Sequence, residues 1–212
     1  MTLKFLGTRA FIDVATRAHR RHSAALVRHG RARVMIDAGL DWLGKLNRIR
    51  PDAIVLTHGH PDHAFGLAHG APCPVYATAA THALLGRFPI AQRRVIAPRR
   101  AVTLGGIRFT AFPVEHSIRA PAVGYRVVAG RRALFYAPDL VAIRDRAAAL
   151  HRVRLYVGDG SSLIRPIVRR RGRARFGHAA IREQLGWCAA EGVPRATFTH
   201  AGAALVRADG PA

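Results

Sequence analysis

The sequence predicts a mixed α/β domain, in which a mixed β-sheet or a pair of sheets is covered by helices. About half of the 212 residues are hydrophobic, which is enough for one sizeable core. Short segments rich in Val, Ile, Phe and Tyr recur between glycines and prolines, as strands do. Some of these segments follow one another directly and others alternate with helical segments. This mixture disfavours a purely parallel sheet. The length indicates a single domain over residues 1–212.

Each predicted strand is a short apolar segment bounded by turn-forming residues. The segment "RALFYAPD" follows "AVGYRVVAG" so closely that "GRR" at 130–132 predicts a hairpin turn. In chain order, the predicted strands are residues 3–7, 23–29, 33–37, 53–58, 74–78, 93–97, 106–116, 122–130, 132–139, 154–160 and 195–200.

The helices predicted between these strands are residues 40–48, 62–69, 78–86, 143–150 and 178–191. In the last of them, Ile181, Leu185 and Cys188 recur close to the 3.6-residue period of a helix. The segment "RPIVRRRGRARF", residues 165–176, contains six arginines. We interpret it as an exposed loop between a strand and a helix.

The charge of the chain is unusual, with a formal net charge of +22 from 34 Lys+Arg against 12 Asp+Glu. Such an excess favours polyanionic partners. The two cysteines, Cys73 and Cys188, form no CxxC pair and predict reduced thiols in a cytoplasmic protein. The sequence shows neither a signal peptide nor an apolar run long enough to cross a membrane.

The most informative motif is "LTHGHPDH", residues 56–63, directly after a buried, β-branched strand. It contains His58, His60, Asp62 and His63. Imidazoles and a carboxylate at this density suit zinc, or manganese or iron when more oxygen ligands are added. The alternative is a polar turn with incidental histidines, which the spacing H-x-H-x-D-H disfavours.

The motif resembles the signature of the metallo-β-lactamase-fold hydrolases. The resemblance implies an αββα sandwich of two mixed β-sheets flanked by helices, with two metals at one edge between the sheets. It also implies that later strands end in further ligands, which are His116 in "FPVEHS", Asp139 in "FYAPDL" and His200 in "TFTH". On this pattern one metal is held by His58, His60 and His116, the other by Asp62, His63 and His200, and Asp139 lies between them.

Every ligand position holds the expected residue type, which indicates an active enzyme. A pair of divalent metals can clamp the attacking and leaving oxygens of a displacement. Asp62 is a candidate catalytic residue as well as a candidate ligand. Asp37, at the end of an earlier strand in "MIDAG", is a candidate for orienting a ligand histidine; the alternative is a turn-forming aspartate.

Residues at several positions indicate which subfamily of these hydrolases the chain resembles. The commonest class B β-lactamases have a cysteine where this chain has Asp139, which disfavours antibiotic hydrolysis. The flavodiiron proteins have a glutamate where it has His60, which disfavours electron transfer to oxygen. The opening "KFLGT" and the segment from "RFGHAAI" to "TFTH" are similar to RNase Z and to the cyclic phosphodiesterase of phosphonate breakdown.

Those enzymes have a histidine at the start of the helix before the last ligand strand. The resemblance implies that His178 is catalytic, as a phosphate donor or a general acid. The alternative is a helix residue without a role. Arg169, Arg170 and Arg171 precede it and are candidate substrate-binding residues, because a guanidinium binds two phosphate oxygens at once. Ser161 is a further substrate-binding candidate; the alternative for the arginines is a solvated charged loop.

The sequence therefore predicts a cytoplasmic hydrolase with two divalent metal ions, zinc first among them, acting on a phosphodiester in a nucleic acid or a cyclic nucleotide. RNase Z grips tRNA with a long arm for which this chain has no room, so tRNA processing is disfavoured. One alternative is an ester, thioester or lactone hydrolase of the same fold. Another is a nucleic-acid-binding module with a structural metal site, which seven ligands disfavour because structural zinc sites have four. We expect no membrane partner, and the oligomeric state stays open, with a dimer among the options.

Overall fold

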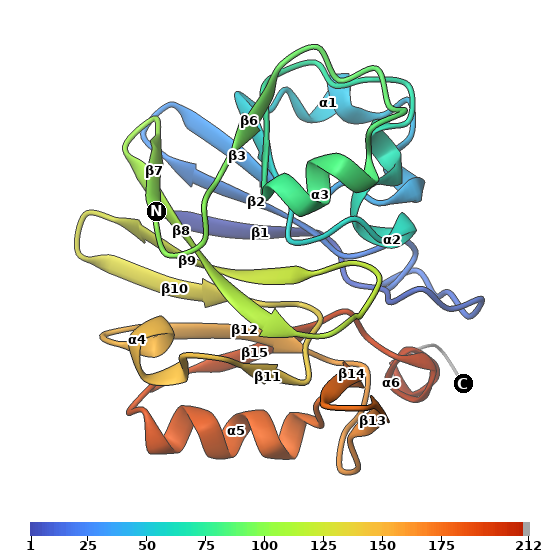
Figure 1. Ribbon diagram of the computed structural model, residues 1–212, viewed down its shortest axis with the longest axis vertical. Coiled ribbons are helices and arrows are strands. Elements are labelled where there is room, and N and C mark those ends of the chain that lie inside the picture. Colours follow the sequence, from blue (N-terminus) through green and yellow to red (C-terminus); the bar gives the residue numbers. More distant parts are fainter. Residues whose placement is uncertain (210–212) are drawn as a thin grey trace.

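Two β-sheets lie face to face in the middle of the molecule, and helices cover their outer sides (Figure 1). The computed structural model describes residues 1–209. The first sheet is antiparallel from β1 to β3 and parallel from β3 to β6. Its strands, in both chain and spatial order, are β1 (Thr2–Gly7), β2 (Ala24–His29), β3 (Ala32–Ile36), β4 (Ala53–Val55), β5 (Val75–Ala77) and β6 (Arg93–Val95).

The second sheet is also mixed, and its order is β11-β8-β9-β10-β12-β15, with β7 paired to β8. The pairs formed by β7 to β11 are antiparallel, whereas β10, β12 and β15 run parallel. Its strands are β7 (Ala101–Leu104), β8 (Ile107–Glu115), β9 (Ala122–Ala129), β10 (Arg132–Tyr136), β11 (Ala142–Ile143), β12 (Leu155–Asp159) and β15 (Ala196–Thr199).

Short helices cover the first sheet, and one longer helix lies against the second (Figure 1). On the first sheet lie the 3-10 helices η1 (Leu40–Trp42) and η2 (Phe65–Leu67) with α1 (Leu46–Ile49), α2 (Pro61–Ala64) and α3 (Ala79–Leu84). The second sheet has α4 (Arg146–Leu150) and α5 (Ile181–Ala190), and α6 (Ala203–Ala208) follows β15.

Three apolar layers hold these elements together, as a four-layer sandwich requires. Alternation along β2 sends Val27 into the cluster between the sheets and Leu26 into the cluster under the first set of helices. A third cluster, with Tyr156 and Trp187, lies between the second sheet and α5. Because strands in both sheets are buried on both faces, they read as continuous apolar runs in the sequence.

The two sheets are also joined by hydrogen bonds at one end of β4. The hydroxyl of Tyr125 on β9 donates to the carbonyl of Leu56 at 2.8 Å, in a wholly buried position. The backbone N–H of Val123 donates to the carbonyl of Thr57 at 3.0 Å. These bonds fix the chain directly before the H-x-H-x-D-H motif relative to the second sheet.

The predicted fold class is confirmed, and each predicted strand corresponds to an observed one with ends shifted by a few residues. The hairpin turn between β9 and β10 is also present. Predicted helix 40–48 divides into η1 and α1, and predicted helix 62–69 divides into α2 and η2. The sequence analysis missed β7, β11 and α6, of which β11 has only two residues and β7 lies at an edge of its sheet.

The prediction of a loop at 165–176 was wrong. This segment forms a two-stranded antiparallel hairpin of its own, β13 (Ile167–Arg171) and β14 (Ala174–His178), with Gly172 at φ 57° in the turn. The arginines hid the alternation that would have predicted strands, because a run of like charges reads as a solvated loop. As a consequence His178 ends β14, and α5 begins only at Ile181.

No helix within residues 1–209 is long and apolar enough to span a membrane.

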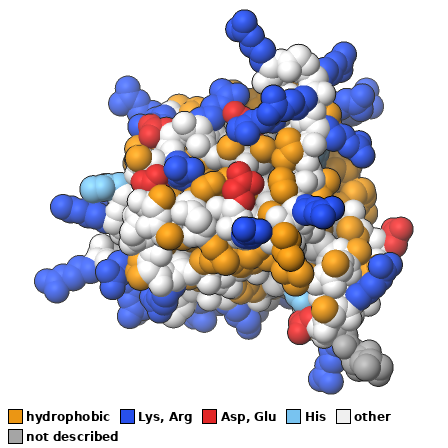
Figure 2. Space-filling view, turned by 90° about the horizontal axis from the view of Figure 1, so that it is seen from below, with side chains coloured by type: hydrophobic (Ala, Val, Ile, Leu, Met, Phe, Trp, Pro, Cys, Tyr) orange, Lys and Arg blue, Asp and Glu red, His pale blue; other side chains and the backbone are white. Residues whose placement is uncertain are grey.

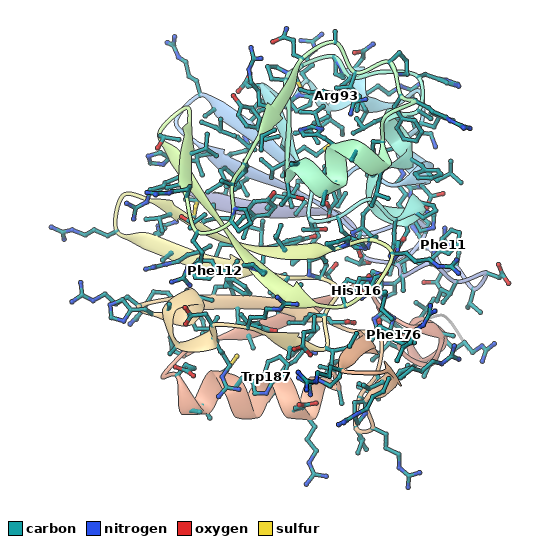
Figure 3. The ribbon with its side chains drawn as sticks, in the orientation of Figure 1. Phe11, Arg93, Phe112, His116, Phe176 and Trp187 are labelled. Carbon is teal, nitrogen blue, oxygen red and sulfur yellow. The ribbon has the colours of Figure 1, made fainter. Side chains whose placement is uncertain are left out.

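One arginine stabilises the end of a helix on the first sheet. The guanidinium of Arg93 donates to the carbonyls of His82, Leu85 and Phe88 at 2.7–3.1 Å, around the C-terminal end of α3 (Figure 3). His82 lies in the last turn of the helix, whereas the carbonyls of Leu85 and Phe88 follow it and also accept backbone N–H groups. A cation at this end interacts favourably with the helix dipole.

We therefore expect Arg93→Ala to lower the free energy of unfolding by about 2 kcal/mol, the range of hydrogen bonds to a charged group. Urea denaturation measures the change. The neighbouring Arg94→Ala is the matched control, because Arg94 is exposed and makes one long contact at 3.5 Å. Equal effects of the two substitutions would contradict this assignment.

Candidate metal centre

Histidines and carboxylates follow the ends of six strands at one edge of the sandwich. Because the carboxyl ends of parallel strands meet at one edge of a sheet, side chains that follow them lie close together. The antiparallel β8 ends at the same edge and adds a further histidine. These residues are Asp37 after β3, His58 after β4, His116 after β8, Asp139 after β10, Asp159 at the end of β12 and His200 after β15.

The structure brings all seven predicted ligands into one buried cluster. One group that could hold a metal ion consists of His58, His60, His116 and Asp139. A second group consists of Asp62, His63 and His200. The Oδ2 atom of Asp139 lies between the two groups, 3.5–3.6 Å from the Nε2 atoms of His58, His63 and His200.

Asp37 fixes two of the histidines from outside the cluster. Its Oδ2 accepts a hydrogen bond from His63 Nδ1 at 2.9 Å, and both its oxygens accept from the hydroxyl of Thr57. Because that hydroxyl donates to Asp37, it accepts from His58 Nδ1, which lies 3.1 Å away. Both rings therefore carry their proton on Nδ1 and turn Nε2 toward the cluster. The interpretation of Asp37 as an orienting residue agrees with this geometry.

Two further imidazoles, those of His200 and His116, are oriented from outside the cluster. Ser161 Oγ donates to the carbonyl of His200 and lies 2.9 Å from its Nδ1, so it accepts the Nδ1 proton. His116 Nδ1 donates to the carbonyl of Gly177 at 3.1 Å. Gly177 itself has φ 120°, and an added Cβ would lie 1.9 Å from the carbonyl oxygen of Ile167. A glycine is therefore required where β14 approaches His116.

The cluster suits divalent cations because lone pairs converge in it. When only Nδ1 is protonated, the Nε2 lone pairs of His200 and His63 face the Oδ2 of Asp62 at 3.1 and 3.2 Å. The wholly buried Nε2 of His63 has no hydrogen-bond partner among residues 1–209. Buried acceptors that face one another are costly unless a cation lies between them. The mixed nitrogen and oxygen donors fit zinc, manganese or iron.

Charge in the cluster is divided between the two halves. Burial lowers the pKa of His58 well below its usual value and that of His60 to about 4, and neighbouring imidazoles add to both effects. Burial also lowers the pKa of His63 and of His200, but the adjacent carboxylates have the larger effect and raise each pKa to about 10. Protons on these two rings compensate the buried carboxylates, so metal binding has to displace them.

A third group of donors lies beside the first two. His178 Nδ1 lies 2.9 Å from Asp159 Oδ2 and 2.9 Å from Asp139 Oδ1. Burial lowers the pKa of His178, but these carboxylates outweigh it and raise the pKa to about 11. With Nδ1 held by two carboxylates, Nε2 is the ring nitrogen that stays free.

Asp159 is fixed in turn by a wholly buried glutamine on α5. Gln184 Oε1 accepts from the backbone N–H of Asp159 and from the hydroxyl of Tyr156, both at 2.9 Å. Its Nε2 donates to the carbonyl of Asp159 at 2.8 Å. The helix after the hairpin is thus connected to the centre through a side chain that the sequence analysis did not single out. The sequence pattern could have indicated Gln184, because this polar residue lies on the same helix face as the apolar, buried Trp187 and Cys188.

Two site residues have backbone conformations that favour glycine. Asp37 has φ 60° and His200 has φ 57°. A residue other than glycine in this region costs free energy, and such residues persist where the surrounding structure determines them. Both side chains make several hydrogen bonds in the centre, which accounts for their presence at these positions.

A cavity of about 540 Å³ opens over the centre. His60, Asp62, His116, Asp139, His178 and His200 line one side of it. Phe11, Ile12 and Ile167 line another side, and Phe11 is 63% exposed. The segment with Phe11 is anchored to the last ligand strand, since Ala201 N donates to Thr8 O at 2.6 Å and Ala10 N donates to Ala201 O at 3.1 Å.

Ser161 also lines this cavity, but no arginine or lysine of residues 1–209 does. Arg169, Arg170 and Arg171 are exposed on β13, farther along the hairpin. The sequence analysis missed the apolar side of the cavity, because isolated apolar residues in an irregular segment have no periodic signal. It also missed Thr57, which precedes His58 in the motif.

The fold and the donor set together define a metal-dependent hydrolase. The chain belongs to the β-lactamase superfamily, since residues 32–201 match the family model described as the beta-lactamase superfamily domain. This match includes all seven ligand positions. No curated protein matches the sequence.

Solved structures with the same fold include three similar ones. A diphosphatase of the PhnP family has a TM-score of 0.71 at 23% identity and covers 94% of this chain and 85% of its own. The metallo-beta-lactamase fold protein YhfI from Bacillus subtilis has a TM-score of 0.71 at 19% identity, with coverage of 94% and 85%. The short form of human tRNase Z has a TM-score of 0.68 at 18% identity, with coverage of 95% and 93%.

The role of Asp37 can be tested by removing its charge while keeping its shape. We expect Asp37→Asn to lower metal affinity about 10- to 100-fold, the usual cost of losing a group that orients a ligand. Isothermal titration with Zn²⁺ measures the affinity. Asp52→Asn is a matched control, because Asp52 also accepts a backbone N–H, from Arg33, but lies on an exposed turn. An unchanged affinity in Asp37→Asn would contradict the role.

Proposed function

We propose that this protein is a dinuclear metal hydrolase, with zinc as the first candidate metal, that cleaves a phosphodiester. The observation that carries the proposal is the position of His178, which lines the cavity beside both groups of metal donors with its Nδ1 held by Asp159 and Asp139. A cationic donor at this place suits an anionic substrate and an oxyanion leaving group. The PhnP-family diphosphatase and tRNase Z, which share the fold, support this branch.

The metals and the side chains of the protein have different roles in the proposed mechanism. Bound divalent ions supply a nucleophile at neutral pH and neutralise charge on the phosphate oxygens. Asp37, Ser161 and Thr57 hold the ligand imidazoles so that their Nε2 lone pairs point to the centre. Asp159 holds His178 with Nδ1 protonated, and the proton on His178 Nε2 then passes to the leaving oxygen. Phe11, Ile12 and Ile167 keep water away from one side of the reacting group.

A second candidate is the hydrolysis of a carboxylic ester, thioester or lactone. The observation that favours it is the apolar side of the cavity, together with the lack of arginine or lysine among its described lining residues. On this alternative His178 donates to a carbonyl oxygen or to the leaving group. The free cysteines Cys73 and Cys188 support the cytoplasmic location that we propose under either candidate.

The two candidates are separated by one comparison of substrates. Bis-p-nitrophenyl phosphate, p-nitrophenyl acetate and a lactone are assayed with the same preparation, loaded with Zn²⁺ or with Mn²⁺. We expect diester turnover that disappears in Asp139→Ala, because this carboxylate lies between both donor groups, and we expect that variant to lose bound metal. Turnover of the acetate or the lactone alone would refute the phosphodiesterase proposal.

His178 can be tested through the leaving group. We expect His178→Ala to keep its metal content and to lower turnover about 10²- to 10⁴-fold, as the loss of a general acid does. The deficit grows with the pKa of the leaving group, because a poor leaving group depends most on protonation. A series of methyl aryl phosphates measures this slope. A deficit that is the same for every leaving group would exclude proton donation by His178.

A further inference from the structure

The hairpin β13–β14 has two different faces, which its register defines. Side chains alternate along a strand, and directly paired residues of antiparallel strands share a face. The pairs Ile167↔His178, Arg169↔Phe176 and Arg171↔Ala174 therefore lie on one face, which we call the cavity face. The pairs Val168↔Gly177 and Arg170↔Arg175 lie on the opposite face.

Independent contacts identify where each face points. Ile167 and His178, the first pair of the cavity face, both line the cavity over the metal centre. Arg175, on the opposite face, donates to Glu115 at 2.7 Å. The cavity face thus continues outward from the metal centre, whereas the opposite face meets the end of β8. Figure 1 shows the hairpin projecting beside α6, away from the sheets.

The cavity face combines cations with an aromatic ring. Phe176 is partly exposed and lies directly opposite Arg169, while Arg171 follows two residues, or about 7 Å, farther along the strand. Within residues 1–209, Arg169 and Arg171 have no acidic side chain within ion-pair distance. Interleaved guanidiniums and aromatic rings bind single-stranded nucleic acid, since rings stack on bases and cations bind phosphates.

From this arrangement we propose that the cavity face binds a single-stranded nucleic acid and leads it to the metal centre. A base stacks on Phe176, the flanking phosphates lie against Arg169 and Arg171, and the diester to be cleaved reaches His178. The inference rests on the proposed phosphodiesterase function and names its substrate class. It also assigns Arg170 no contact with the strand, because Arg170 lies on the opposite face of the hairpin from Arg169 and Arg171. The linear sequence alone does not distinguish these three arginines.

Charge alone does not identify this surface. Lysine and arginine side chains project from several sides of the face in Figure 2, so a polyanion is attracted to many parts of the molecule. A test therefore has to remove equal charge from the two faces of the same hairpin. Arg169→Gln/Arg171→Gln removes two charges from the cavity face. Arg170→Gln/Arg173→Gln removes two from the opposite face and the turn and is the matched control.

The experiment measures binding of fluorescein-labelled dT12 and rU12 by anisotropy between 50 and 300 mM salt, about the range where counterion release dominates. All variants are made in the zinc-loaded His178→Ala background, which slows turnover during the titration. We expect the Arg169→Gln/Arg171→Gln double variant to reduce the salt slope by about 1.4, for two lost phosphate contacts on a single strand. The control double variant changes the slope much less.

The aromatic ring gives a second readout. We expect Phe176→Ala to weaken binding of both oligonucleotides about tenfold, whereas Phe176→Tyr keeps the affinity because it keeps a ring. Circular dichroism verifies that each variant is folded. Equal slope changes in the two double variants, equal affinities of Phe176→Ala and Phe176→Tyr, or tighter binding of a 12-base-pair duplex would each overturn the proposal. A preference between dT12 and rU12 identifies DNA or RNA as the source of the strand.

Binding and turnover are measured in separate experiments. A failure of the proposed nucleic-acid surface can therefore be distinguished from a failure of the proposed phosphodiesterase reaction. A protein that binds dT12 with the expected pattern but hydrolyses no diester would refute the reaction and keep the surface. A protein that hydrolyses bis-p-nitrophenyl phosphate but loses equal affinity in both double variants would refute the surface and keep the reaction.

Discussion

The centre of this protein depends on the convergence of buried lone pairs from imidazoles and carboxylates. Asp139 is buried, and its two oxygens lie within 3.6 Å of nitrogens of five histidines, which are His58, His63, His116, His178 and His200. Such a set of acceptors is unfavourable by itself and becomes favourable only around positive charge. Protons on His63 and His200 can supply that charge, and divalent metals can supply more of it. The structure around the cluster serves to hold these donors in place against their mutual repulsion.

Two sets of contacts do this, one on each sheet. On the first sheet, Asp37 connects Thr57, His58 and His63 through one carboxylate. On the second sheet, Asp159 connects His178 to Gln184 of the helix α5. The hydroxyl of Tyr125 joins the two sheets next to the motif. Each set fixes the proton positions of its imidazoles from outside, so the donor atoms are oriented before any ligand arrives.

The sequence was sufficient to predict which donors the structure brings together, because the motif directly follows a short buried strand and the resemblance pointed to further donors after later strands. It was also sufficient for the sandwich, once the motif had indicated the family. The hairpin at 167–178 was not predictable in this way, because arginines at alternate and adjacent positions obscure the two-residue period. Gln184 and the cavity residues Phe11 and Ile12 were missed for another reason. Their roles depend on contacts between distant segments, which local patterns do not encode.

The bridge between Thr8 and Ala201 has a consequence for the synthesis of the protein. The last ligand, His200, precedes Ala201, and both join the site only when β15 pairs with β12 and reaches the N-terminal segment. A nascent chain on the ribosome lacks this strand until nearly all of residues 1–209 have been made. The half of the centre formed by His58, His60 and His116 is complete much earlier than the half that needs His200. The donor group that contains His200 is therefore the later of the two to assemble as the chain is made.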